Sequence, residues 1–332
     1  MSHGSLLIVD DEPANLGVLR QILENDYDLM FARHGADALK LADKHPPGLI
    51  LLDIQMPDMD GYEVCRALKA NPKTEDIPVI FVTALSELGN EEVGFDVGCV
   101  DYLIKPVHAG IVRARVRTHL SLVKTQQLEK SQRDAIFMLG KAGHYNDNDT
   151  GVHIWRMAAI ARQLAEAAGW PPARCDLLEL AAPMHDTGKI GIPDAILRKP
   201  GKLDAEEWGI MKTHSRIGYE ILSSSDAPIF QLAAEVALRH HEKWDGSGYP
   251  QGLAGEDIPE SARIVAIADV FDALTMKRPY KDAWPVDKAV ATLREGAGQH
   301  FAPSLIDAFQ ACLPRILAIK AAWDLQEDRE GQ

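Results

Sequence analysis

Histidine and aspartate side chains gather in the C-terminal half of the chain, at the ends of apolar segments. His185 and Asp186 follow one such segment, and His240 and His241 end another. Asp269 lies inside a third, where a carboxylate is unfavourable unless a metal ion or a cation pairs with it. Mixed imidazole and carboxylate ligands suit Fe, Mn, Co, Ni or Zn. A carboxylate that bridges two such ions, about 3.5–4 Å apart, is the usual arrangement for hydrolysing a phosphodiester.

A second group of polar side chains follows the short apolar runs of the N-terminal half. Asp10 and Asp11 follow the first run, Asp53 the third, Thr83 the fourth and Lys105 the fifth. If these runs are parallel strands, the side chains meet at one edge of a sheet, where the carboxylates repel one another unless a cation neutralises them. Hard oxygen ligands suit Mg²⁺, and an ionised Asp beside it can accept a phosphoryl group. Thr83 can then bond that group and Lys105 can pair with it.

The elements that must position these residues differ between the two halves. Five apolar runs are continuous, as expected of strands covered on both faces, and amphipathic stretches separate them. They predict a doubly wound, five-stranded parallel sheet of the flavodoxin-like type, with its ligands at the carboxyl ends of the strands. A charged stretch at 111–141 predicts a connecting helix. Beyond it, apolar residues recur at helical spacing, so we expect an α/β domain followed by an all-α domain.

Composition narrows the function classes. With 332 residues, the chain is long enough for two domains. The 35 Lys and Arg against 49 Asp and Glu give a net charge of −14, which argues against nucleic acid and against anionic membranes as partners. Four widely spaced cysteines indicate free thiols in a reducing compartment, and no apolar run reaches the roughly 18 residues of a membrane span. We therefore expect a cytoplasmic protein.

The N-terminal half resembles the receiver domains of response regulators. The matching pieces are VDDEP, LLDIQMPDMDGYEV, VTA and DYLIKP. The resemblance implies that Asp53 is the phosphoacceptor and that Mg²⁺ is held by Asp10, Asp11 and Asp53. It implies three switch residues, Thr83, Tyr102 and Lys105, with Tyr102 as the aromatic that changes rotamer on activation. The implied partners are a cognate histidine kinase and a second copy of the chain in a phosphorylation-dependent homodimer.

The C-terminal half resembles the HD-GYP phosphodiesterases, a branch of the HD phosphohydrolase superfamily. The motifs are HDTGKIGIP at 185–193, HHEKWDGSGYP at 240–250 and ADVFDALTMKRPYK at 268–281. The resemblance implies two divalent transition-metal ions, with Asp186 as the bridging ligand. The metal ligands that it implies are His153, His185, Asp186, His214, His240, His241 and Asp269.

The same resemblance implies the substrate and the residues that contact it. Enzymes of this family open cyclic di-GMP to linear pGpG, and a second cut yields GMP. Lys189 lies one turn after Asp186 and would offset the charge that develops on the scissile phosphate, so the implied catalytic residues are Asp186 and Lys189. The ring of Tyr249 offers a stacking surface for guanine. The implied substrate contacts are Lys189, Tyr249, Pro250, Asp272, Arg278 and Lys281.

Together the resemblances predict a receiver domain at residues 1–122, a connecting helix at 123–139 and an HD-GYP domain at 140–332 whose activity phosphorylation controls. One alternative is a module that binds cyclic di-GMP, or docks a protein partner at the GYP loop, with little turnover. Another is a hydrolase that prefers pGpG, cyclic GMP-AMP or a nucleoside triphosphate. The full ligand set argues against a sensor, the GYP segment disfavours a triphosphohydrolase, and no basic helix-turn-helix supports a DNA-binding output.

The metal stoichiometry follows from one departure from the family pattern. Many HD-GYP enzymes have Glu, a ligand of a third ion, four residues before the first histidine, where this chain has Asp149. A residue four positions back on a helix faces the same way, but the Asp side chain is shorter by about 1.5 Å. We predict that elemental analysis of the fully loaded chain finds two transition-metal ions rather than three. A third ion per chain would show that Asp149 still supports the extra position.

Overall fold

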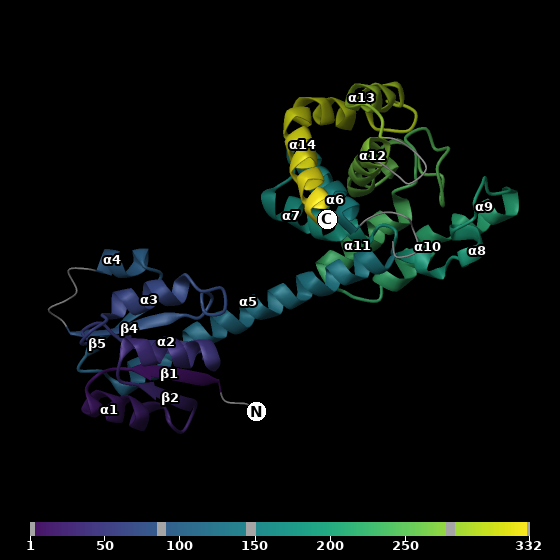
Figure 1. Cartoon of the computed structure of the whole chain (residues 1–332). Helices are drawn as coiled ribbons and strands as arrows, with labels where there is room; N and C mark the ends of the chain where they lie inside the picture. The colour runs from purple at the N-terminus through teal and green to yellow at the C-terminus, as the bar shows by residue number, and fades with distance from the viewer. Residues whose placement is uncertain (1–3, 85–90, 144–150, 277–282, 331–332) are drawn as a thin grey trace. The chain divides into compact units, whose positions relative to one another are not determined.

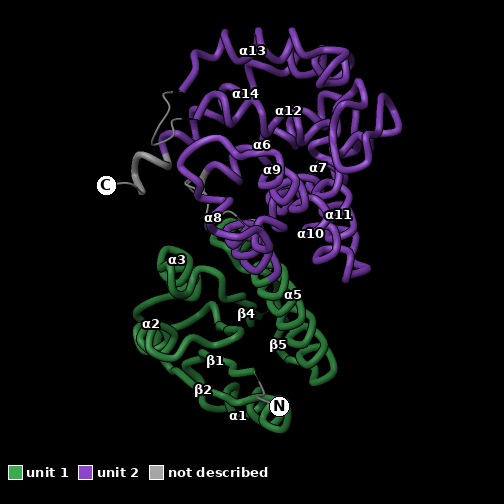
Figure 2. Tube along the Cα trace, turned by 90° about the vertical axis from the view of Figure 1, so that its right-hand side faces the viewer, with its two compact units in different colours: residues 1–131 green, residues 132–332 purple. Residues whose placement is uncertain are grey.

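The computed structural model describes residues 4–84, 91–143, 151–276 and 283–330 (Figure 1). The chain divides into two compact units, residues 1–131 and 132–332 (Figure 2). The border between them falls inside 123–139, the segment for which the sequence predicts a connecting helix. Among the helices of the described ranges, none combines the length and the apolar character that crossing a membrane requires.

The first unit contains a parallel sheet with the strand order β2-β1-β3-β4-β5. This confirms the predicted doubly wound sheet, and its switch point lies between β1 and β3, where such sheets bind their ligands. The strands are β1 (Ser5–Val9), β2 (Asp28–Ala32), β3 (Leu49–Asp53), β4 (Val79–Ala84) and β5 (Asp101–Lys105). The helices that accompany them are α1 (Pro13–Leu23), α2 (Gly35–Lys44), α3 (Gly61–Lys69) and α4 (Glu91–Asp96).

Both faces of the sheet are covered by helices, which explains why each strand has apolar residues at consecutive positions. Successive side chains of a strand point to opposite faces, so each strand contributes to two cores. One core joins the sheet to α2 and α3, and the other joins it to α1 and to the start of helix α5 (Ala109–Gly143). The strand residues Leu7, Ile50 and Val79 belong to the first core, and Leu6, Leu49 and Ile80 to the second.

Helix α5 takes part in both units. Val112 and Val116 are buried in the core of the first unit, whereas Ile136 is buried in the second. The helix is longer than the predicted connecting segment 123–139, because neither Pro nor Gly interrupts the chain between Gly110 and Gly140. Helix α5 therefore includes residues of both units.

Helices joined by loops make up the described part of the second unit, where the β-pairing is limited to an isolated bridge between Ala297 and Phe301, and this confirms the all-α prediction. Its α-helices are α6 (Gly151–Ala167), α7 (Pro172–Ala181), α8 (Asp194–Leu197), α9 (Ala205–Met211), α10 (His214–Leu222), α11 (Pro228–Arg239), α12 (Glu260–Thr275), α13 (Val286–Glu295) and α14 (Pro303–Glu330). Its described residues also form the short 3-10 helices η2 (Ala182–Met184), η3 (Thr187–Gly191) and η4 (Gly255–Asp257).

Two apolar clusters support the ends of these helices. The larger cluster includes residues of α6, α7, α12, α13 and α14, among them the edge-to-face pair Phe271 and Phe309, with ring centroids 5.1 Å apart. The smaller cluster holds Ile136 of α5 together with Met184 and Ala237. Met184 directly precedes His185, and Ala237 lies three residues before His240. The candidate ligands therefore extend from segments that are anchored in a core.

Candidate metal centre and phosphoacceptor site

The polar residues at the strand ends of the first unit lie close together. Asp10 and Asp53 are buried, and Lys105 Nζ donates hydrogen bonds to Asp10 Oδ2 at 2.9 Å and to Asp53 Oδ1 at 2.8 Å. One oxygen from each of Asp10, Asp11 and Asp53 lies within 4.8 Å of the other two. Lys105 pairs with two of these three carboxylates, so the site retains negative charge and its oxygen ligands suit Mg²⁺.

The raised pKa of the Asp53 carboxyl group indicates that this site favours an added cation. Burial raises the pKa of Asp53 to about 6, and the carboxylate of Asp10 adds to the rise, while Lys105 opposes it. Asp10 is held in place because its Oδ1 accepts from Glu12 N at 2.9 Å and from Asn15 Nδ2 at 3.0 Å. A divalent cation would lower the cost of keeping these buried carboxylates ionised.

The other two expected switch residues lie on neighbouring strands. Thr83 is buried near the end of β4. Tyr102 is buried on β5, with its ring 5.7 Å from that of Phe81 and 5.4 Å from that of Phe95. A Cβ added to Gly94 of α4 would lie 1.7 Å from the Tyr102 hydroxyl oxygen. Tyr102 therefore points inward against α4, in a space that exists because residue 94 has no side chain.

In the second unit, three buried imidazoles each donate Nδ1–H to a backbone carbonyl oxygen. The pairs are His185 with Ala182 at 2.9 Å, His214 with Met211 at 2.8 Å and His240 with Val236 at 3.1 Å. A carbonyl oxygen can only accept, so the ring proton of each neutral imidazole is at Nδ1. The lone pair is therefore at Nε2, which is the arrangement that binds a metal ion.

The three Nε2 atoms surround the carboxylate of Asp186. Asp186 Oδ1 lies 3.3 Å from the Nε2 of His214 and 3.6 Å from that of His240. Asp186 Oδ2 lies 3.3 Å from His185 Nε2 and 2.7 Å from Lys189 Nζ. The two oxygens thus face different imidazoles, as a carboxylate that bridges two metal ions must.

The donor set fits divalent transition metals. One ligand atom from each of Asp186, His214, His240 and His241 lies within 4.8 Å of the other three. His240 Nε2 is buried and has no hydrogen-bond partner among the described residues. Opposing nitrogen and oxygen lone pairs repel one another, and a metal ion held by these residues would replace that repulsion by coordination.

Burial keeps these imidazoles in the form that binds metals. It lowers the pKa of His214 to about 4, although the carboxylate of Asp186 opposes the change. Burial and the neighbouring His240 also lower the pKa of His241 well below its usual value. Both rings are therefore neutral near pH 7, and no proton has to leave before a metal ion binds.

A glycine lets the turn that carries Asp186 and Lys189 approach the ligand His214. A Cβ added to Gly188 would lie 1.9 Å from the carbonyl oxygen of His214 and 2.4 Å from Gly218 N. Any side chain at residue 188 would therefore force η3 away from α10. The glycine of the HDTGK segment thus sets the distance between the carboxylate and one of its imidazole neighbours.

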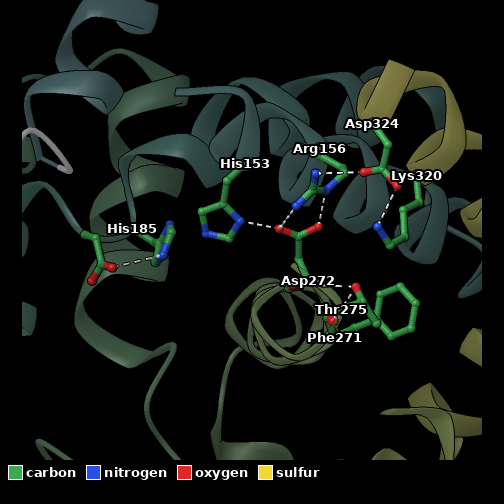
Figure 3. Close-up of polar contacts among 9 residues, drawn as sticks. His153, Arg156, His185, Phe271, Asp272, Thr275, Lys320 and Asp324 are labelled. Carbon is green, nitrogen blue, oxygen red and sulfur yellow. Dashed lines mark hydrogen bonds and ion pairs between the residues drawn. The ribbon is translucent and has the colours of Figure 1, made fainter. Parts of the chain in front are cut away.

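His153 is held by a buried network of charged residues (Figure 3). Its Nδ1 donates to Asp272 Oδ2, and Arg156 Nε donates to Asp272 Oδ1 at 2.5 Å. Arg156 also contacts Asp324 Oδ1 at 3.0 Å, and Asp324 Oδ2 accepts from Lys320 Nζ at 2.7 Å. Burial would raise the pKa of Asp272, but His153 and Arg156 outweigh it and lower that pKa.

The placement of Asp272 disagrees with the substrate contact expected from the sequence. Its side chain is fully buried, and both of its oxygens accept hydrogen bonds from His153 and Arg156. A carboxylate in this position cannot reach a ligand in solution. It orients an imidazole instead, as the carboxylate partners of metal-binding histidines do.

The remaining expected residues lie around the centre. His153, His185 and Asp269 are outside the group of four whose ligand atoms lie mutually within 4.8 Å. Asp269 is half-buried on α12, one turn before Asp272, and its charge acts on Tyr249. Their roles as ligands stay predictions. The expected positions outside the described residues are Asp149, Arg278 and Lys281.

Tyr249 of the GYP segment packs on the metal centre. Its ring stacks on that of His241, with centroids 4.7 Å apart and planes 28° apart, and its backbone N donates to the carbonyl oxygen of His241 at 3.2 Å. Burial raises the pKa of the Tyr249 hydroxyl, so the side chain is neutral. Pro250 is exposed. One face of the Tyr249 ring is therefore already covered by a histidine.

Sequence reasoning missed the residue that holds the GYP loop in place. Glu242 is buried, and its carboxylate oxygens accept from Gln251 N at 2.7 Å and from Leu253 N at 3.0 Å. A Cβ added to Gly248 would lie 2.3 Å from Lys243 N, so the loop also needs a glycine there. The signal was present in the sequence, because Glu242 directly follows the two histidines, but only its burial reveals the contact.

Comparisons with known proteins find the same two kinds of domain. The family described as "Response regulator receiver domain" matches residues 6–117, and the family described as "HD domain" matches residues 118–305, more than half of the chain. A "Probable cyclic di-GMP phosphodiesterase" of Vibrio cholerae serotype O1 is 41% identical, over 93% of this chain and 78% of that protein. The "Cyclic di-GMP phosphodiesterase response regulator RpfG" of Xanthomonas campestris pv. campestris is 39% identical, over 92% and 86%. A "3'3'-cGAMP-specific phosphodiesterase 2" of Vibrio cholerae serotype O1 is 45% identical, over 59% and 37%.

The fold and the two sites define a response regulator whose output domain is a helical, metal-dependent hydrolase. The chain belongs to the family of response-regulator phosphodiesterases that join a receiver domain to an HD domain of the HD-GYP type.

The buried network leads to a prediction about metal affinity. Asp272→Asn preserves the size of the side chain but removes the anionic acceptor that orients His153, so Mn²⁺ binding to the full chain should weaken about 10- to 100-fold. Titration calorimetry measures this affinity, and thermal unfolding checks that the variant is folded.

The matched control is Asp324→Asn. Asp324 contacts the outer side of Arg156, and its side chain is 43% exposed. Because exposed ion pairs contribute little, Mn²⁺ affinity should stay within about fivefold of the wild type. Equal affinities in the two variants would mean that Asp272 does not orient a ligand.

Proposed function

We propose that the second unit hydrolyses cyclic di-GMP to linear pGpG at a centre of two divalent ions, and that phosphorylation of Asp53 controls the rate. One observation carries the catalytic part. The two oxygens of Asp186 face different imidazoles, and Lys189 Nζ lies 2.7 Å from Asp186 Oδ2. This arrangement can hold two ions and bring a cation to a phosphodiester.

Each residue of the centre has a role that its surroundings support. The histidines present Nε2 because backbone carbonyls hold the proton at Nδ1, and Asp186 would join the two ions. When bound, such ions supply Lewis-acid chemistry and a nucleophilic water at neutral pH. Lys189 would turn from Asp186 toward the phosphate and offset the negative charge that develops there. Fe, Mn, Ni, Co and Zn all suit this donor set.

The substrate proposed rests on two relatives that match most of the chain, each of which is named for cyclic di-GMP. A second candidate is 3'3'-cGAMP, which is favoured by the 45% identity to a relative named for that dinucleotide. The centre acts on a phosphodiester in either case, so contacts with the bases determine which of the two dinucleotides is preferred. Hydrolysis of pGpG to GMP is a further step of the same chemistry.

The regulatory part of the proposal rests on the end of α5. Within the second unit, a Cβ added to Gly140 would lie 3.2 Å from the Pro183 carbonyl oxygen. One added to Gly143 would lie 2.8 Å from Thr187 Cα and 3.1 Å from the carbonyl oxygen of Asp186. A helix this close to the backbone of the bridging ligand can displace it by a small shift. The proposal includes a histidine kinase as phosphodonor, a homodimer as the phosphorylated form and a protein partner at the GYP loop.

Turnover tests the catalytic part. The full chain, loaded with Mn²⁺ or with Fe²⁺ under anaerobic conditions, should convert cyclic di-GMP to pGpG. Chromatography measures this product, and parallel reactions use 3'3'-cGAMP and pGpG as substrates. Lys189→Met should lower kcat about 100- to 1,000-fold, because it removes a cation aimed at the developing charge. The control Lys202→Met, at an exposed lysine, should keep the wild-type rate. Binding of cyclic di-GMP without any turnover would favour the sensor alternative.

Phosphorylation tests the regulatory part. With Mg²⁺ and acetyl phosphate as phosphodonor, the rate of the wild-type chain should change, and Asp53→Asn should abolish that response because an amide cannot accept the phosphoryl group. The control Asp58→Asn alters an exposed aspartate near the site and should respond as the wild type does. An unchanged response in Asp53→Asn would contradict this mode of control.

A further inference from the structure

Helix α9 has exposed apolar side chains that are not buried in a hydrophobic core. None of its residues is buried, and Trp208 and Ile210 are 46% and 37% exposed. Apolar side chains normally face a core, so a helix that turns them to solvent is a candidate binding surface.

The helix is held in place by polar contacts at its start. Asp204 Oδ1 accepts from Glu206 N at 3.0 Å and from Glu207 N at 2.9 Å, and Asp204 N donates to Glu207 Oε2 at 2.8 Å. Lys199 Nζ donates to Glu207 Oε1 at 2.7 Å. This capping box stabilises the start of α9 through contacts that do not involve the Trp208 side chain.

Trp208 lies beside the metal centre. Helix α9 ends at Met211, whose carbonyl oxygen accepts from His214 Nδ1 at 2.8 Å. The ring of Trp208 is 6.3 Å from that of Tyr249, at 80°, and Tyr249 stacks in turn on His241. A continuous row of aromatic rings therefore leads from solvent to a candidate metal ligand.

The charge next to this row suits an anionic ligand. Lys212 Nζ lies 5.9 Å from the centroid of the Tyr249 ring. The chain as a whole carries a net charge of −14, which repels an anionic phosphodiester. The positive charge of Lys212 opposes that repulsion beside the Tyr249 ring. A nucleotide combines a flat base with that negative charge.

The stacking surface expected from the sequence was Tyr249, but His241 covers one face of that ring. We propose that Trp208 is the residue on which a guanine base of the substrate stacks, with Lys212 as the cation beside it. This inference rests on the proposed function and assigns the contact that binds a base of the dinucleotide. Base stacking on an aromatic side chain contributes to binding rather than to the chemical step.

Kinetics of the metal-loaded full chain test the assignment. Trp208→Ala should raise the KM for cyclic di-GMP roughly 5- to 150-fold with kcat nearly unchanged, and Trp208→Phe should recover most of the affinity because it restores a ring. The matched control Tyr219→Ala removes another exposed ring, 40% exposed on α10, and should leave KM unaltered.

Tryptophan fluorescence provides a second measurement that does not depend on turnover. Cyclic di-GMP should quench the emission of the wild-type chain, and Trp208→Phe should lose that quenching. Quenching at Trp208 without hydrolysis would support the stacking contact and overturn the proposed function. Hydrolysis with an unchanged KM in Trp208→Ala, or with quenching that persists in Trp208→Phe, would overturn the stacking contact and leave the proposed function standing.

Discussion

The catalytic unit depends on one unfavourable juxtaposition, a carboxylate that faces the lone pairs of several imidazoles. Asp186 lies 3.3 Å from the Nε2 atoms of His185 and His214 and 3.6 Å from that of His240. Because backbone carbonyls accept from Nδ1 of each ring, the neutral form of each imidazole directs the Nε2 lone pair toward the carboxylate. Only added positive charge makes the arrangement favourable. Lys189 supplies part of it, and the remainder calls for metal ions.

Helical ends and close glycine contacts hold this arrangement. His214 begins α10 and His240 follows α11, while Asp186 belongs to a turn that Gly188 brings against the backbone of His214. The receiver site uses the same principle in another fold, because a single described lysine, Lys105, pairs with both buried Asp10 and buried Asp53 at the ends of parallel strands. Both sites are therefore short of positive charge. The net charge of −14 is concentrated in part where metal ions would reverse it.

Buried charges elsewhere in the catalytic unit are balanced by protein groups instead. Asp272 and Arg156 compensate each other beneath His153, and the exposed ends of Asp324 and Lys320 complete the network. The groups that surround a carboxylate therefore distinguish a candidate metal ligand from a residue that positions a ligand or a loop. A ligand carboxylate faces lone pairs, whereas a supporting carboxylate such as Asp272 or Glu242 has both of its oxygens engaged by N–H donors.

Local pattern determined most of the fold and the identity of the candidate ligands. Continuous apolar runs specify strands buried on both faces, helical spacing specifies the second unit, and long motifs such as HDTGKIGIP name residues that are adjacent in the chain. Tertiary structure decided what no local pattern contains. Asp272 and His153 are 119 residues apart, so their contact, and the loss of Asp272 as a substrate residue, depend on how α6 packs against α12. The chain must also fold before Trp208 lies beside Tyr249 and before Glu242 binds the backbone of the GYP loop. The tautomer of each histidine depends on a nearby backbone carbonyl, whose position the helix geometry sets.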